Sequence, residues 1–104
     1  MIDAVLKEFL EQIKPVRSQI QGLTLFGSRA RGDHRSDSDY DLLVLVEKKE
    51  DHLIDSLYEA VMNVLLSHSR LISLKVFEEK EFARLQALHT PFVERVINEG
   101  VPIG

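Results

Sequence analysis

Short β-prone runs alternate with helix-length segments along this chain of 104 residues. The runs lie at 23–26, 40–46 and 71–77. Apolar residues at 2–13 and 54–65 repeat instead with helical spacing. Helices and strands in alternation bury their apolar surfaces as one sheet with helices packed on it. We therefore predict an α/β or α+β fold with one small sheet.

The ends of the helices are also predicted. Pro15 stops the first helical pattern, and the second begins after a charged turn at 47–51 and ends near 67–69. A further helix is expected at 79–88. Thr90 is the expected N-cap of the last helix, with Pro91 in its first turn and Gly100 just past its end.

Composition limits the possible classes of protein. Apolar residues make up 44% of the chain, enough for the core of one domain at this length, so residues 1–104 are predicted to form a single domain. There is no cysteine, which excludes disulfides, thiol chemistry and zinc sites built on cysteine.

Charge and hydropathy bear on location and partners. The start of the chain lacks a basic region and no apolar run approaches about 18 residues, so we expect a cytoplasmic protein with no membrane segment. The net charge of −4 argues against broad electrostatic binding to nucleic acid, which depends on Lys and Arg.

The stretch from Gly27-Ser28 to Asp39-Tyr40-Asp41 carries the candidate chemistry. Gly27 ends a β-prone run, so the backbone amides that follow can point at an anion, and we expect a short helical turn from Ser28. Asp39 and Asp41 alternate with Tyr40, which places both carboxylates on one face of a strand and Tyr40 in the core. A Mg²⁺ ion takes one or two carboxylates plus phosphate oxygens, so this pair beside a phosphate loop predicts a metal–nucleotide site.

Two other phosphate- or metal-binding motifs match this segment only in part. Glycines 27 and 32 have the spacing of a P-loop, but Asp33-His34 stand where Lys and Ser or Thr are needed. The EF-hand spacing from Asp37 fails because Leu42 replaces the turn glycine.

Arginines in the same loop add positive charge. We assign Arg29 and Arg31 to phosphate contact, the alternative being solvated loop charges. An isolated Asp-x-Asp is usually the solvent face of a strand, and it is the upstream Gly-Ser that favours a site here.

The motif Gly-Ser, ten residues, then Asp-Tyr-Asp resembles the minimal nucleotidyltransferases of the DNA polymerase β superfamily. The segment 91–100 also resembles the way these small proteins end. The resemblance implies a mixed sheet with the active site at its open face, and transfer of a nucleoside monophosphate from a triphosphate such as ATP, with Mg²⁺, to a hydroxyl.

One position departs from that family. Its active members carry a third carboxylate on the strand after the long helix, and Ser73 stands at that position, with Lys75 two residues on. A hydroxyl is a poor substitute for a carboxylate as a metal ligand. Glu78 and Glu79, beyond the strand, are the alternative carboxylates.

The resemblance also implies a partner. Larger relatives carry a helical domain that binds the acceptor, whereas the minimal ones act with a separate small helical protein of the HEPN type, as antitoxins in toxin–antitoxin pairs. In some pairs the partner itself is adenylylated on a tyrosine. The alternatives are an inactive module that neutralises a partner by binding, and a transferase acting on a small molecule or an RNA end.

Overall fold

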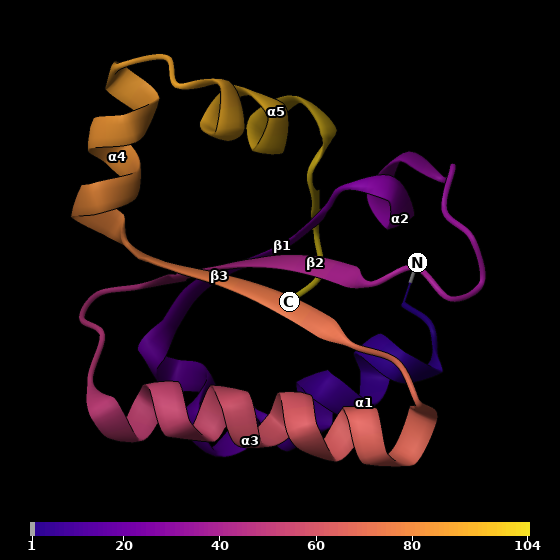
Figure 1. The fold of residues 1–104 in the computed structure, drawn as a ribbon. Coiled ribbons are helices and arrows are strands. Elements are labelled where there is room, and N and C mark those ends of the chain that lie inside the picture. The colour runs from indigo at the N-terminus through magenta and orange to yellow at the C-terminus, as the bar shows by residue number, and fades with distance from the viewer. Residues whose placement is uncertain (1) are drawn as a thin grey trace.

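A four-stranded sheet organises the computed structural model, which describes residues 2–104 (Figure 1). Its strands are β1 (Ile20–Phe26), β2 (Tyr40–Val46), β3 (Ile72–Glu78) and β4 (Val101–Pro102), in the spatial order β3-β2-β1-β4. β1 runs antiparallel to β2 and to β4, while β2 and β3 are parallel. The predicted small mixed sheet is confirmed.

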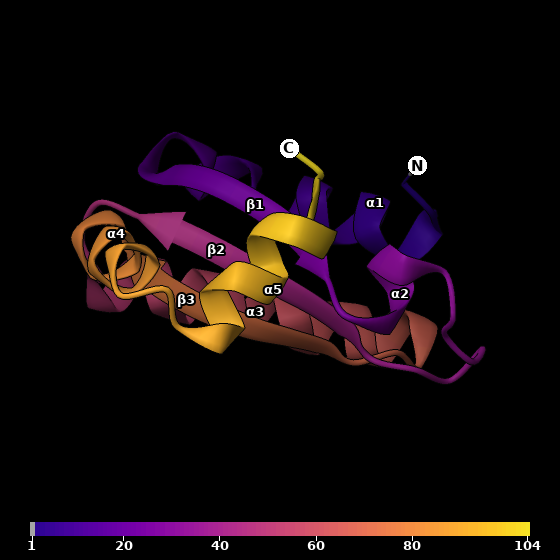
Figure 2. The ribbon, with the colours of Figure 1, turned by 90° about the horizontal axis from the view of Figure 1, so that it is seen from above.

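Helices cover both faces of this sheet (Figures 1 and 2). On one face lie α1 (Ala4–Gln12), the 3₁₀ helix η1 (Lys14–Gln19) and α3 (Asp51–His68). On the other lie α4 (Glu79–Ala87) and α5 (Pro91–Glu99), while α2 (Ser28–Arg31) is a single turn between β1 and β2. Within residues 2–104 no helix has the length and apolarity needed to cross a membrane.

Strand β2 divides its side chains between the two layers. Tyr40, Leu42 and Val44 are buried in the larger core with α1 and α3. Leu43 is buried in a smaller core below α4 and α5, where the rings of Phe26 and Phe92 meet edge to face at 5.6 Å. Because strand side chains alternate, Asp41 is on this second face, away from α1 and α3.

The structure departs from the expected element boundaries in three places. β1 begins at Ile20 rather than at residue 23, because Gln21 and Gly22 interrupt the apolar pattern of the sequence. The β1–β2 register shifts between Ile20 and Gly22, and Ile20 still pairs with Val46. β4 was not predicted, since two residues give no periodicity. Thr90 is the N-cap residue of α5, as predicted, but its hydroxyl donates to the Leu85 carbonyl at 3.1 Å and makes no capping hydrogen bond to the helix.

A partly buried polar contact joins the start of β2 to the start of α1. The Tyr40 hydroxyl donates to Oδ2 of Asp3, whose Oδ1 accepts from the Leu6 amide at 3.0 Å and so caps α1. Burial, followed by this hydrogen bond, raises the pKa of Tyr40 to about 12. Tyr40 therefore belongs to the core, as predicted from the strand alternation.

Replacing Tyr40 by Phe should cost about 2 kcal/mol of unfolding free energy at neutral pH, the range for a hydrogen bond to a charged group. The folded pKa of about 12 lies above the value of about 10 in an unfolded chain. The stability that the hydroxyl adds is thus fully present below pH of about 10 and is lost as pH rises through about 12. Urea denaturation of the wild type and of Tyr40→Phe across this pH range measures the difference in unfolding free energy. A difference that does not change with pH would contradict the prediction.

Candidate active site

A glycine turn follows β1. Gly27 has φ 76° and ψ −158°, a conformation that is essentially restricted to glycine, and it is the N-cap of α2. The amides of Ala30 and Arg31 both donate to the Gly27 carbonyl at 3.1 Å, and α2 ends at Gly32. The helical turn expected from Ser28 is confirmed, and Ser28 is its first residue.

Gly27 lies directly against a carboxylate. A Cβ atom built on Gly27 would collide with Oδ2 of Asp41. Phe26 is paired with Asp41 across the β1–β2 ladder, so the register brings the turn and the carboxylate together. Gly27 and Asp41, which the sequence motif joins in one predicted site, thus lie side by side.

The two aspartates share this end of β2. Asp39 is exposed just before the strand, and Asp41 is half-buried within it. The pKa of Asp41 is raised, first by burial and then by the negative charge of Asp39, while Lys75 and Arg31 act in the opposite direction. The negative charge of Asp39 disfavours the charged form of Asp41, so a cation bound at these two carboxylates would be favourable.

This pair fits one magnesium ion shared with a phosphate ligand, because Mg²⁺ is usually held by one or two carboxylates plus phosphate oxygens. Within residues 2–104 no group of three His, Cys, Asp or Glu side chains could hold a metal ion by itself. The residues that could bind the ion are therefore Asp39 and Asp41, with the remaining ligands supplied from outside the chain.

Ser73 is the neighbour of Asp41 on the adjacent strand. The parallel register pairs Asp41 with Ser73 and Leu43 with Lys75, so both β3 side chains share the face of Asp41. Adjacent strands are about 4.8 Å apart, so Ser73 and Asp41 are neighbours on this face of the sheet. Lys75 adds a positive charge beside them, as its effect on the pKa of Asp41 shows.

Glu78 lies at the other end of β3. It is paired with Val46, five residues or about 16 Å along the strand from Ser73. Its Oε2 accepts from the Lys49 amide at 2.9 Å, and its side chain also forms a capping box with Glu81 at the start of α4. Glu79 begins α4 beyond it. The structure therefore places neither glutamate at the acidic pair.

Arg29 holds the loop that connects α2 to β2. Its Nε donates to the Ser38 carbonyl at 3.0 Å and its Nη2 to the Ser36 carbonyl at 3.1 Å. The guanidinium carbon also lies 3.9 Å from the centroid of the Tyr40 ring. These contacts set the path of the loop just before Asp39, and the phosphate contact assigned to Arg29 from the sequence stays a prediction.

Arg31 connects α2 to the end of α5. Its Nε pairs with Asp33 at 3.2 Å and its Nη1 with Oε2 of Glu99 at 3.0 Å. The side chain is partly exposed, so the pairs are screened by solvent. Sequence analysis missed Glu99, because no local signal joins residues that are 68 positions apart.

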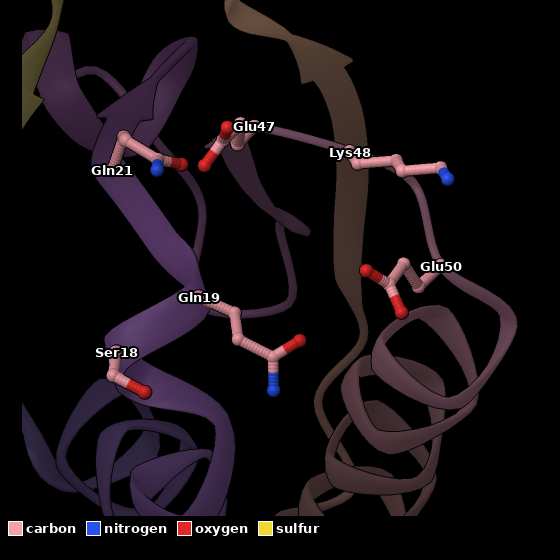
Figure 3. A pocket seen from close by; sticks show the side chains of 6 residues that line it. All are labelled: Ser18, Gln19, Gln21, Glu47, Lys48 and Glu50. Atoms are coloured by element: carbon pink, nitrogen blue, oxygen red, sulfur yellow. The ribbon is translucent and has the colours of Figure 1, made fainter.

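A separate polar hollow lies at the opposite end of β1 and β2 (Figure 3). It is lined by Ser18, Gln19, Gln21, Glu47, Lys48 and Glu50. Gln21 and Glu47 point toward one another, and Lys48 extends away (Figure 3). None of these residues belongs to the Gly27–Asp41 arrangement, so we do not assign the site there.

Comparison with known proteins decides the family. The profile of the family described as "Polymerase beta, Nucleotidyltransferase" matches residues 6–104. The chain belongs to this family. Two relatives from Methanocaldococcus jannaschii carry the provisional name of protein adenylyltransferase. MJ0604 is 32% identical over 81 residues, 71% of this chain and 81% of the relative, and MJ0141 is 31% identical over 107 residues, 95% of each chain.

Solved structures of low identity share the fold of this polymerase β nucleotidyltransferase. A toxin–antitoxin structure with AMP-PNP superposes with a TM-score of 0.58 at 16% identity, covering 92% of this chain and 69% of the other. A Sulfolobus solfataricus protein, provisionally named a nucleotidyltransferase, gives 0.56 at 21% identity and covers 94% and 75%.

The Gly27 contact yields a test with a matched control. Gly27→Ala should lower the unfolding free energy by about 3 kcal/mol, because it adds backbone strain and pushes Asp41 away. Gly32 also has a positive φ, 84°, but no atom lies within 4 Å of a Cβ added there. Gly32→Ala should therefore lower the unfolding free energy by only about 1 kcal/mol. Urea denaturation compares the two, and equal losses would show that Asp41 does not constrain Gly27.

Proposed function

We propose that residues 1–104 work as one minimal nucleotidyltransferase domain that transfers AMP from ATP to a hydroxyl with Mg²⁺. The observation that carries this proposal is the contact between the Asp41 carboxylate and the Gly27 turn, with Asp39 beside it. Membership of the family and the names of the two archaeal relatives support the same reaction.

Each residue has a defined part in the proposed reaction. The phosphates of ATP lie on the turn at Gly27, where the Ser28 hydroxyl and the Arg31 guanidinium donate to their oxygens. Asp39 and Asp41 would hold the magnesium ion, which would supply positive charge opposite the phosphates. The acceptor oxygen bonds to the α-phosphorus as the bond to the bridging oxygen of the β-phosphate breaks. Pyrophosphate leaves with that electron pair, and the hydroxyl proton passes to solvent.

The proposed acceptor is a hydroxyl of a small helical partner of the HEPN type, in a toxin–antitoxin pair in the cytoplasm. Two kinds of support exist: the resemblance of the motif to the minimal nucleotidyltransferases, and the fold shared with toxin–antitoxin structures, one of which contains AMP-PNP. The relatives' provisional name, protein adenylyltransferase, agrees with a protein acceptor.

A second candidate function follows from Ser73. In register with Asp41, this serine occupies the proposed position of the third carboxylate, and Lys75 brings a positive charge where a second cation would need a negative one. These residues favour a catalytically weak or inactive domain that binds nucleotide and neutralises its partner by binding. The two candidates share the nucleotide site and differ in whether transfer occurs.

The acidic pair gives the first test. Asp39→Asn with Asp41→Asn should reduce Mg²⁺-dependent ATP binding at least 100-fold, because both proposed metal ligands lose their charge. The fold should persist, since removing charge from Asp41 relieves the cost that raises its pKa. Isothermal calorimetry measures the affinity, with Asp37→Asn, in the exposed loop, as the matched control. Unchanged affinity in the double variant would refute the metal–nucleotide site.

Ser73 gives the test that separates the two functions. Ser73→Asp with Lys75→Val should raise nucleotide transfer tenfold or more, because an anionic ligand at this place helps to activate the attacking hydroxyl. Transfer is measured as pyrophosphate release and as added AMP mass on a co-expressed HEPN-type protein encoded beside this chain. Ser73→Asn, similar in size but neutral, is the control.

The wild-type protein decides between the candidates in the same assay. Rapid transfer by the wild type, with no gain on adding the aspartate, would show that Ser73 is not at the place of a missing ligand. If Ser73→Asp with Lys75→Val transfers nucleotide and the wild type does not, the wild-type domain is better described as the nucleotide-binding module of the second candidate function.

A further inference from the structure

The outer side of α3 carries a continuous apolar stripe. Tyr58, Met62 and Leu66 are exposed by 47%, 52% and 77%, and they are four residues apart. Residues at this spacing are neighbours on one side of a helix, so their side chains form one surface. We call these three residues the α3 stripe.

The side of α3 that faces the sheet is occupied by contacts within the chain. Its buried residues, Leu57 and Val64 among them, belong to the core below the sheet. α1 holds α3 from the side, where Asn63 donates to Gln12 at 3.0 Å and His68 contacts Glu8 at 3.0 Å. The stripe takes no part in these contacts. Single exposed apolar residues are ordinary, but a contiguous row on a helix marks an interaction surface.

Three carboxylates border the α3 stripe. Asp51, Asp55 and Glu59 are exposed and also lie four residues apart. Asp55 and Glu59 are neighbours of Tyr58 and Met62 at a spacing of three residues, and Asp51 continues the acidic row one turn toward the N-terminus. None of them forms an ion pair within residues 2–104. These three carboxylates therefore form an acidic row, without ion pairs in the described residues, along the N-terminal half of α3.

We propose that the α3 stripe docks an amphipathic helix of another protein, with apolar residues on one face and Lys or Arg along its border. The apolar face would pack on Tyr58, Met62 and Leu66, while its basic residues pair with the three carboxylates. α3 has 18 residues and is about 27 Å long, which gives room for a docked helix of four or five turns.

A second copy of this chain fits the surface poorly. It would bring one acidic row against another, since the stripe and the carboxylates share the same helix. The docking surface is on the face of the sheet opposite Asp41, so it does not depend on the proposed transfer reaction.

The test uses a synthetic peptide of about 22 residues with leucines on one helical face and lysines along its border, labelled for fluorescence anisotropy. It should bind the wild-type chain at least tenfold more tightly than a matched peptide with glutamates for the lysines, and more weakly as salt is raised. Met62→Ser with Leu66→Ser should weaken binding of the basic peptide at least tenfold. The control is Leu88→Ser, which removes an apolar side chain 67% exposed at the end of α4 and should leave binding unchanged.

The double variant keeps the net charge of the chain, so general attraction of a lysine peptide to an acidic protein cannot mimic the result. Equal binding of the peptide by wild type and double variant would overturn the proposal, as would equal binding of the two peptides. Sedimentation of the wild type as a dimer that the double variant converts to monomer would assign the stripe to a second copy instead. Thermal melts by circular dichroism verify that all variants remain folded.

Discussion

The contact between the Asp41 carboxylate and the backbone of Gly27 is the constraint on which the candidate site depends. It requires that residue 27 have no side chain, and it requires the pairing of Phe26 with Asp41 that the antiparallel β1–β2 register supplies. A shift of that register by one residue would turn Asp41 toward α1 and bring Tyr40 out of the core. The same pairing that buries Tyr40, Leu42 and Val44 therefore holds the carboxylate beside the turn.

The sequence predicted the parts of this protein whose signals are local. Both ends of β2 agree with the structure, because its apolar run lies between a polar loop and the charged turn at 47–51. The short helix at Ser28 follows from Gly27 and its neighbours. Contacts between distant segments could not be predicted in this way. The pairing of Arg31 with Glu99 depends on how α5 lies across the sheet, and the loop contacts of Arg29 depend on the path of residues 36–38.

The position of Ser73 relative to Asp41 depends on the register between β2 and β3. Ile72 and Leu74 pack in the larger core and Phe77 packs against the smaller one, so Ser73 lies on the face of Phe77. The sequence could not say which residue of β2 would lie opposite Ser73. The parallel pairing answers that question with Asp41, and it moves Glu78 to the far end of the strand. The residues of β3 that lie on the face of Asp41 and near it are thus Ser73 and Lys75, and neither is a carboxylate.

The loop at 27–39, which carries the candidate site, joins two strands that are close in the sequence, whereas the pairing of β1 with β4 joins strands that are far apart in the sequence. Phe26 meets Asp41 across this short connection, whereas Leu25 meets Val101 across most of the chain. Closing a short loop costs less chain entropy than closing a long one. The turn and the acidic pair thus belong to one hairpin of low contact order, and a change that loosens β4 from β1 should spare them.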